Sequence, residues 1–286
     1  MKDEAAKVRN IELKLSYVGT AYKGWQIQPK AQTVQGVMNR QLRRLLQVKE
    51  FRSIGSSRTD SGVHAHDQRM SFFTTHPFPI DSLKRALNHG LPPDIRVHDA
   101  VERPADFSSR YASKAKLYSY VIFNKTFVSP FVSPLGYTVR RPLDTDLLNR
   151  AAAQYVGRRC FRLFQAPRDS RENTISTIYA ARVTRIGDLI HFDVVGSHFL
   201  YRMVRNMAGA LMMLGLGNWD YPTFSHKLRH EVQFINQLTL PGAGLHLMRV
   251  YTHEPGTVIE ETHLPFLNNL ASLLESERPL SMGPQA

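Results

Sequence analysis

Hydrophobic positions in the first third of the chain follow two different periods, and each period predicts one kind of element. Residues 11–17 carry apolar side chains at every second position, which predicts a half-buried strand. Residues 34–46 carry them at helical spacing, which predicts a helix with one buried face. The further predictions for this third are strands over 70–74 and 95–101 and, between them, a helix over 81–90 with Asp81 as its N-cap.

The second half of the chain repeats this order of elements, although no close sequence repeat is present. Gly187 and Asp188 supply the turn of a predicted hairpin. Each half therefore runs strand, helix, strand, helix, strand, as split βαβ units do. The elements predicted here are strands over 116–123, 178–185, 189–195 and 245–251 and helices over 144–156, 198–214 and 264–274.

The charge of the chain adds a candidate partner to this outline. The 286 residues suffice for about two domains, and the 42% of hydrophobic residues can bury a core. Lys and Arg number 37 against 24 Asp and Glu, so the net charge of +13 indicates a polyanion, most commonly nucleic acid. Residues 140–205 hold twelve Arg and no Lys, and the planar guanidinium suits phosphates and bases. A solvated basic surface is the alternative interpretation.

Cysteine content and hydropathy exclude several other classes. Cys160 is the single cysteine, which excludes an intrachain disulfide and a multi-cysteine zinc site. The first ten residues contain no apolar stretch, so no secretory signal is expected. The longest apolar run, 208–216, is too short to span a bilayer. We therefore expect a soluble protein of a reducing compartment, without a membrane partner.

Residues 55–64, Gly-Ser-Ser-Arg-Thr-Asp-Ser-Gly-Val-His, are the first candidate for chemistry. Glycines and small polar residues predict a loop between strands that presents Asp60 on a tight turn. The alternative is a turn in which Asp60 only caps backbone N–H groups, and spacing alone favours that alternative.

Two further segments carry aromatic and basic residues. Tyr118 and Tyr120 share one face of a predicted strand, where a ring can stack on a base, although such a pair alone is more often part of the core. Arg202 and Arg205 are three apart and are expected on one face of the predicted helix 198–214. An arginine on such an apolar helix needs a carboxylate partner, unless both are surface arginines with extended stems.

These segments occur together with others in a fixed order. The loop matches the pattern Gly-x-x-Arg-Thr-Asp-x-Gly-Val-His at every fixed position. The chain thereby resembles the TruA family of tRNA pseudouridine synthases from about Ile11 to Tyr251. The other motifs that carry the resemblance are residues 17–28, 33–35, 106–110, the Lys-x-Tyr-x-Tyr segment 116–120, 199–206 and 241–245.

The resemblance implies a mechanism and its catalytic residues. Asp60 is the implied nucleophile, which attacks the target uridine so that the base detaches, rotates and rejoins through carbon 5. Arg205 is the implied partner that keeps this carboxylate ionised. Tyr118 is expected to pack on the target base. The rearrangement has no net redox change, so no cofactor is expected.

The expected substrate-binding residues are Arg58, Tyr118, Arg202 and His64. Arg58 resembles the residue that helps to hold the base out of the stack. His64, His66 and Asp67 together raise the alternative of a metal hydrolase, but no further His follows at the required spacing, and no metal site is expected.

The resemblance also implies the architecture and the partner. The expected fold is α/β (α+β), with two split-βαβ halves, RRM-like or ferredoxin-like, that form a continuous antiparallel sheet around a central basic cleft. The expected domains are 8–105 with the Asp60 loop, 106–253 with Tyr118 and the arginine helix, and a tail over 254–286. The implied substrate is uridine at positions 38 to 40 in the anticodon stem-loop of tRNA. A homodimer in the cytoplasm is expected.

The sequence departs from the family pattern at a few positions. These are Val18, Ser56, Ser57, Thr174 and the segment 158–160. None of them is Asp60, Tyr118 or Arg205, so they bear on RNA specificity more than on chemistry. The alternative function is a catalytically inactive RNA-binding protein or tRNA chaperone of the same fold. The presence of all three catalytic candidates favours an enzyme.

Overall fold

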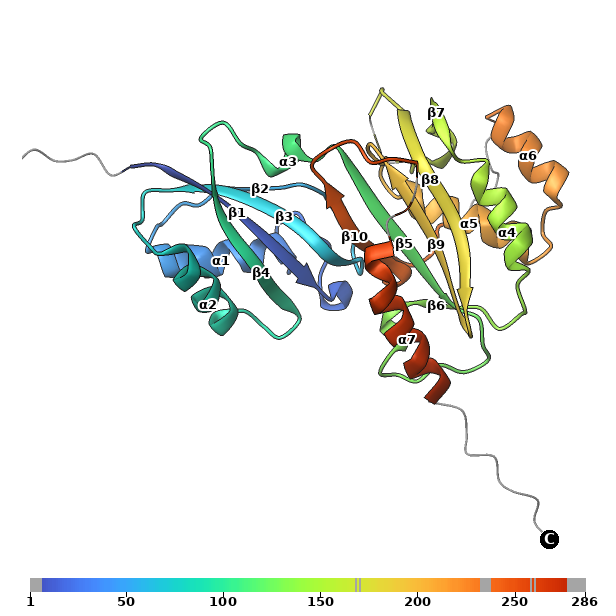
Figure 1. The fold of residues 1–286 in the computed structure, drawn as a ribbon, viewed down its shortest axis with the longest axis horizontal. Coiled ribbons are helices and arrows are strands. Elements are labelled where there is room, and N and C mark those ends of the chain that lie inside the picture. Colours follow the sequence, from blue (N-terminus) through green and yellow to red (C-terminus); the bar gives the residue numbers. More distant parts are fainter. Residues whose placement is uncertain are drawn as a thin grey trace, which may run out of the picture. The chain divides into compact units, whose positions relative to one another are not determined.

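A computed structural model describes residues 7–167, 169, 171–231, 238–257, 259 and 261–276. The chain forms two compact units, shown with their elements in Figure 1. Unit 1 holds the chain up to Lys116 together with His246–Glu254, and unit 2 holds Leu117–Leu245 and the chain from Pro255 onward. Within the described ranges, no helix is both long and apolar enough to cross a membrane.

Unit 1 is built on β1, which lies between two antiparallel neighbours. Its strands are β1 (Arg9–Tyr17), β2 (Ser53–Gly55), β3 (His64–Thr74), β4 (Ile95–Arg103) and β10 (Leu245–Tyr251). β3 and β4 flank β1, β2 pairs antiparallel with β3, and β10 pairs parallel with β3. The helices α1 (Val34–Leu46) and α2 (Ile80–Gly90) pack side by side under these strands, and α3 (Ser109–Ala112) is a single turn (Figure 1).

The predicted strand at β1 is confirmed, and its polar face is more covered than the alternation implies. Asn10 and Glu12 are buried together with the apolar face. Asn10 donates to the carbonyls of Pro104 and Phe107, and the Glu12 carboxylate lies 2.7 Å from Arg103. The Asn10 amide nitrogen and the Glu12 carboxylate therefore have partners, whereas the Asn10 side-chain oxygen has none among the described residues.

The helices of unit 1 are confirmed, with one boundary corrected. α1 begins after Thr33, whose hydroxyl accepts a hydrogen bond from the Gly36 N–H. The prediction that Asp81 is the N-cap of α2 is wrong. Asp81 lies in the first turn of the helix, and Pro79 occupies the cap position with an extended ψ of 134°. A carboxylate in the first turn still complements the positive end of the helix dipole.

Unit 2 contains strands in the order β5, β9, β8, β7. They are β5 (Ala115–Phe123), β7 (Gly157–Cys160), β8 (Ile175–Ile186) and β9 (Leu189–Gly196), with β6 (Tyr137–Thr138) parallel beside β5. The predicted hairpin is confirmed: β8 and β9 pair antiparallel from Ile186 and Leu189 onward, and Gly187 takes a φ of +57° in the turn. Glycine adopts this left-handed conformation without a steric cost.

The helices of unit 2 are α4 (Thr145–Ala153), α5 (Met203–Gly215), α6 (Tyr221–Arg229) and α7 (Leu264–Ser276). α4 is confirmed, with Asp144 as its cap. The helix predicted over 198–214 begins at Met203, five residues after the predicted start. Arg202 has a φ of +61°, which a right-handed helix cannot contain. α6 was not predicted, although Asp220 caps it through the Thr223 N–H and a proline stands in its first turn.

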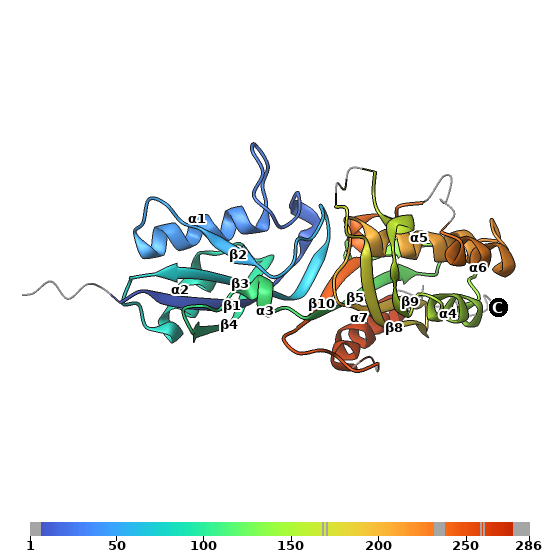
Figure 2. The same ribbon diagram turned by 90° about the horizontal axis from the view of Figure 1, so that it is seen from above.

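Helices cover both faces of the unit 2 strands. Figure 2 shows α5 and α7 on opposite sides of them. The side of α7 holds an apolar cluster. The helix expected over 264–274 is confirmed, and its place in this core cluster was not predicted. The cluster consists of Val121, Phe123, Val132, Leu189, Leu267, Leu270, Ala271 and Leu274.

The predicted class, α/β (α+β) with mostly antiparallel strands, is therefore confirmed. The domain boundaries expected from the sequence stay predictions.

Candidate functional site

The loop that carries Asp60 joins β2 to β3, as predicted. β2 ends at Gly55 and β3 begins at His64. The Val63 N–H donates to the Asp60 carbonyl at 3.2 Å, and Gly62 has a φ of +79°. These features define a four-residue turn that needs glycine at its third position. The expectation that a tight turn presents Asp60 is confirmed.

The segment after β1 holds this loop from one side. The Trp25 N–H donates to the Thr59 carbonyl at 3.0 Å, and the Gly62 N–H donates to the Tyr22 carbonyl at 3.3 Å. A Cβ on Gly24 would lie 2.5 Å from the Thr59 oxygen, and Gly24 has a φ of +90°. Only glycine allows the two backbones to approach this closely. The family-like opening motif thus has a structural reason: it forms the support of the loop.

β3 holds the loop from the other side. The Ser56 hydroxyl donates to Oε1 of Gln68 at 2.9 Å, and Nε2 of Gln68 donates to the Ser57 carbonyl at 2.9 Å. The Ser56 N–H donates to the Arg69 carbonyl at 2.8 Å. Both serines are buried. The departure from the family pattern at Ser56 therefore serves the internal support of the loop.

The three candidate residues of unit 1 differ in accessibility. Arg58 is exposed and Asp60 is half-buried. His64 is only 2% exposed; its Nδ1 accepts a hydrogen bond from the Gly19 N–H at 3.1 Å, and its ring stacks on His246 at 4.6 Å. A substrate contact by His64 stays a prediction, and these contacts give it a positioning role in unit 1.

The alternative metal cluster near His64 is engaged in internal contacts. Oδ1 of Asp67 lies 3.0 Å from Nε of Arg69, and its Oδ2 accepts a hydrogen bond from the Val250 N–H at 3.0 Å. Nε2 of His66 lies 3.3 Å from Nδ1 of His246. Oδ1 is therefore engaged by a side chain of the same strand, and Oδ2 joins β3 to β10.

The two tyrosines of β5 lie in different environments: Tyr120 belongs to the core, and Tyr118 is the candidate site residue. The Tyr120 hydroxyl donates to the Pro241 carbonyl at 2.8 Å, and a Cβ on Gly244 would lie 2.6 Å from the Tyr120 ring. Burial raises the pKa of Tyr120 well above its usual value. Tyr118 is 6% exposed, and its ring meets Phe199 edge-on at 5.2 Å. Tyr120 is thus a core residue, and Tyr118 keeps the site assignment as a prediction.

Arg205 and Arg202 lie in different settings, so the expectation of a shared helical face is wrong. Arg205 lies in the first turn of α5, half-buried, and its Nε donates to the Leu240 carbonyl at 2.7 Å. Arg202 precedes the helix, is exposed, and places its guanidinium 4.9 Å from the centre of the Tyr201 ring. The left-handed backbone of Arg202, with a φ of +61°, places this residue before the helix, which the spacing alone could not reveal.

A pocket that the sequence did not predict lies beside Arg202. It has a volume of about 330 Å³ and is lined by Ala166, Pro167, Tyr201 and Arg202. Asp169 supports this surface: its Oδ2 accepts a hydrogen bond from the Tyr201 N–H at 2.7 Å. A hydrogen bond from Arg171 lowers the pKa of Asp169 to about 2.

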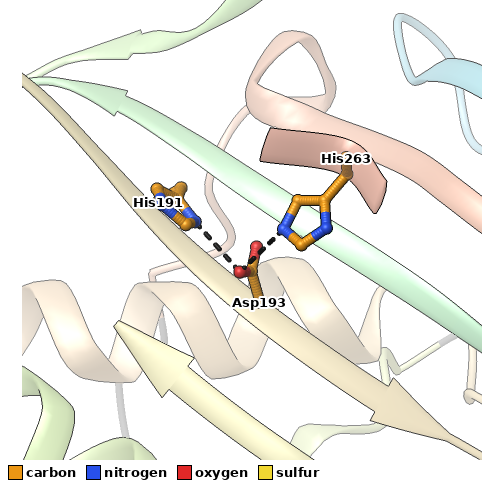
Figure 3. Close-up of side chains that lie close together, drawn as sticks. All are labelled: His191, Asp193 and His263. Atoms are coloured by element: carbon orange, nitrogen blue, oxygen red, sulfur yellow. Dashed lines mark hydrogen bonds and ion pairs between the residues drawn. The ribbon is translucent and has the colours of Figure 1, made fainter. Parts of the chain in front are cut away.

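One group of three side chains in the described part of unit 2 is arranged so that it can hold a metal ion. His191, Asp193 and His263 lie together, buried, on the side of α7 (Figure 3). The sequence offered one signal for it, since His191 and Asp193 are two apart on a predicted strand and share a face. His263 comes from a distant segment that no spacing rule connects to them.

Known proteins similar to this chain agree on one description. A family model described as tRNA pseudouridine synthase matches residues 15–112 and 151–251. A curated tRNA pseudouridine synthase A of Caldicellulosiruptor bescii is 36% identical over 243 residues, which cover 85% of this chain and 99% of the relative. The protein of the same description from Halalkalibacterium halodurans is 37% identical over 238 residues, which cover 83% and 90%. That of Geobacter sp. (strain M21) is 36% identical over 248 residues, which cover 86% and 100%.

Among solved structures, a chain of a Cbf5-Nop10-Gar1 complex is similar with a TM-score of 0.30 and 10% identity, over 70% of this chain and 54% of that chain. This likeness is too weak to carry an argument.

Proposed function

Because this chain belongs to the tRNA pseudouridine synthase family and is therefore an isomerase, we propose that it converts uridine to pseudouridine in the anticodon stem-loop of tRNA, at positions 38 to 40. Asp60 is the nucleophile in this proposal. The observation that carries it is the turn at Asp60–Val63, which presents a half-buried carboxylate on a loop supported from both sides.

The chemistry needs a carboxylate whose position is fixed. The Asp60 oxygen forms a bond to the target nucleotide, and the bond between the sugar and N1 of uracil breaks. The base rotates and rejoins the sugar through carbon 5, and the bond to Asp60 breaks, which regenerates the carboxylate. The proton of carbon 5 is lost in the last step, and N1 gains one, so no redox partner is required. The loop accepts a backbone hydrogen bond from Trp25 and donates one to the Tyr22 carbonyl, and these bonds keep the nucleophile in place.

Unit 2 supplies the other proposed groups. Arg205 pairs with the Asp60 carboxylate and keeps it ionised. The Leu240 carbonyl fixes its Nε, which orients the guanidinium. Tyr118, held edge-on by Phe199, packs on the target base. Arg58 and Arg202 are exposed cations that contact the RNA, and His64 supports the loop.

We also propose that the protein acts as a homodimer in the cytoplasm, which the family resemblance supports. Light scattering of the purified protein tests the oligomeric state. A mass of one chain at working concentration contradicts this part of the proposal and leaves the chemistry unaffected.

The function is tested by mapping pseudouridine in tRNA transcripts incubated with the protein. We expect product at uridines 38, 39 and 40 and none when these are replaced by cytidine. Product elsewhere in the tRNA contradicts the anticodon stem-loop assignment alone. Binding of tRNA without any product supports the alternative of an inactive RNA-binding protein.

A further inference from the structure

The buried group His191, Asp193 and His263 lies in unit 2, on the face of β9 that α7 covers. His191 and Asp193 project from β9, and His263 comes from the 3-10 turn Glu261–His263 that leads into α7. The first two are 0% exposed and His263 is 5% exposed. Figure 3 shows the two rings on either side of the carboxylate, each with a nitrogen 3.0 Å from Oδ2 of Asp193.

The contact made by His191 is short but is poorly aligned for a hydrogen bond. Among the described residues, neither ring nitrogen of His191 has a hydrogen-bond partner, although both are buried. Its Nδ1 therefore lies near Oδ2 of Asp193 without being aligned with it. A buried polar group without an aligned partner is costly, and such a group in a native protein calls for an explanation.

We propose that His191, Asp193 and His263 form a binding site for a divalent transition-metal ion, Zn²⁺ in the first place. Two imidazoles and a carboxylate are a donor set that zinc sites use. Donor atoms about 2.0 to 2.2 Å from one ion lie roughly 3 to 3.5 Å from each other. Each imidazole nitrogen lies 3.0 Å from Oδ2 of Asp193, and the three donor atoms all lie within 4.8 Å of one another. A ligating nitrogen points its lone pair at the ion and not at the neighbouring ligand, which accounts for the misaligned contact of His191.

Residues around Asp193 orient its carboxylate, as residues that contact the ligands of a metal ion commonly do. The Ser119 hydroxyl donates to Oδ1 of Asp193 at 2.6 Å, which leaves Oδ2 for the ion. Arg182 is the competing cation, with a terminal nitrogen 3.8 Å from Oδ2. The other terminal nitrogen of Arg182 lies 3.6 Å from Glu261, and the side chain is 35% exposed. Arg182 can therefore turn toward Glu261 when an ion neutralises Asp193.

The position of the site makes its role structural. It is buried, and it joins β9 to the turn before α7, which packs into the apolar cluster through Leu267 and Leu270. An ion held there links the C-terminal helix to the core of unit 2, and its binding free energy adds to the stability of the fold. The inference does not depend on the proposed catalytic roles, because none of the three residues belongs to them.

The test is zinc binding by the full chain after removal of metal with a chelator. We expect calorimetric titration with Zn²⁺ to give one equivalent per chain and the midpoint of thermal unfolding to rise. Removing one of three ligands in His263→Gln or Asp193→Asn is expected to lower the zinc affinity at least tenfold. Uptake below one equivalent by the wild-type protein, or variants with unchanged affinity, overturns the proposal.

A second pair of histidines supplies the matched control. His226 lies in the last turn of α6 and His230 is its C-cap; their ring centroids are 4.4 Å apart, and the pair could bind zinc adventitiously. His226→Ala is expected to keep the wild-type affinity; loss of zinc binding in this variant overturns the assignment. Zinc-edge X-ray absorption on the wild-type protein adds a readout that needs no variant. Two imidazoles with only nitrogen and oxygen donors support the site, whereas a sulfur donor would place the ion at Cys160.

Discussion

The loop 56–63 of unit 1 and the segment 197–206 of unit 2 both carry candidate residues, but they are held in different ways. The loop is supported by backbone hydrogen bonds on both sides and by the close approach of Gly24. The segment also has backbone bonds, such as Ser197 N–H to the Thr177 carbonyl, and side chains add to them: Arg205 bonds to the Leu240 carbonyl, and Asp169 accepts from the Tyr201 N–H. Asp60, the proposed nucleophile, thus stands on a turn that glycine fixes, whereas Arg202, a proposed RNA contact, stands on a segment held in part by side chains.

The same difference decides which region could be predicted. A turn that needs glycine at one position leaves a mark in the sequence, and Gly62 was sufficient to place Asp60. A left-handed arginine leaves no such mark, so the start of α5 was predicted too early. Backbone conformation can therefore be predicted from the sequence where it requires glycine, and it cannot be predicted where a non-glycine residue adopts the left-handed conformation.

The largest effect is expected for Asp60→Asn, which keeps the shape of the loop and removes the charge. A neutral amide cannot form the covalent intermediate, so pseudouridine formation is expected to be abolished under single-turnover conditions. Folding and tRNA binding are expected to remain, because phosphates are held by other residues. Asp81→Asn, an exposed carboxylate of the same unit, is the control with full activity. Wild-type turnover by Asp60→Asn would end the proposed mechanism.

The second prediction sets Arg205 against Arg202. Arg205→Ala removes the proposed partner of the nucleophile, and a loss on the order of 100-fold in the single-turnover rate is expected. Arg202→Ala is expected to keep this rate, because its guanidinium lies over Tyr201 and outside the helix. Equal losses of rate in the two variants would show that the arginines act together, contrary to their separate settings.

Most of the strands and helices followed from periodicity, because each buries one face. What spacing could not supply was the partner of each site residue. Leu240 meets Arg205 across 35 residues, and His263 meets Asp193 across 70. Contacts of this kind depend on the tertiary fold and have no local signature. The family resemblance supplied expected roles for Asp60, Tyr118 and Arg205. It indicated no role for His191 and no pocket beside Tyr201.

The third prediction tests the rigid support of the loop with a matched pair of glycines. Gly24→Ala places a Cβ 2.5 Å from the Thr59 oxygen at a φ of +90°, and a loss of about 2 to 4 kcal/mol in the free energy of unfolding is expected. Gly217 has a φ of +75° with no atom within 4 Å of the added Cβ, so Gly217→Ala is expected to cost about 1 kcal/mol. Urea unfolding measures both. Equal losses would mean that backbone strain alone acts and that the loop contact contributes nothing.

The fourth prediction concerns the side-chain support of the segment near Arg202. The pKa of Asp169 is lowered to about 2 by Arg171, so its contribution to stability is present above the unfolded pKa near 3.8 and is lost as the pH falls toward 2. Asp169→Asn is expected to remove this part of the acid sensitivity between pH 4 and 2, as followed by urea unfolding. Glu172→Gln, an exposed neighbour, is the control. An unchanged pH profile for Asp169→Asn contradicts the assignment.

The smallest effect is expected in the salt dependence of tRNA binding. Each phosphate contact lowers log affinity by about 0.7 to 0.9 per unit of log salt, so a basic protein that holds several phosphates has a steep slope. Arg202 is exposed, and we expect Arg202→Ala to reduce the slope by about one contact while the rate of the chemical step stays unchanged.

Tyr201→Ala separates stacking from charge, because it removes the ring under the guanidinium without changing the net charge. A weaker affinity with an unchanged slope in Tyr201→Ala, together with a reduced slope in Arg202→Ala, would assign a base to the tyrosine and a phosphate to the arginine. A flat salt profile for the wild-type protein would contradict phosphate binding by this segment and leave the rigid Asp60 loop as the better supported of the two regions.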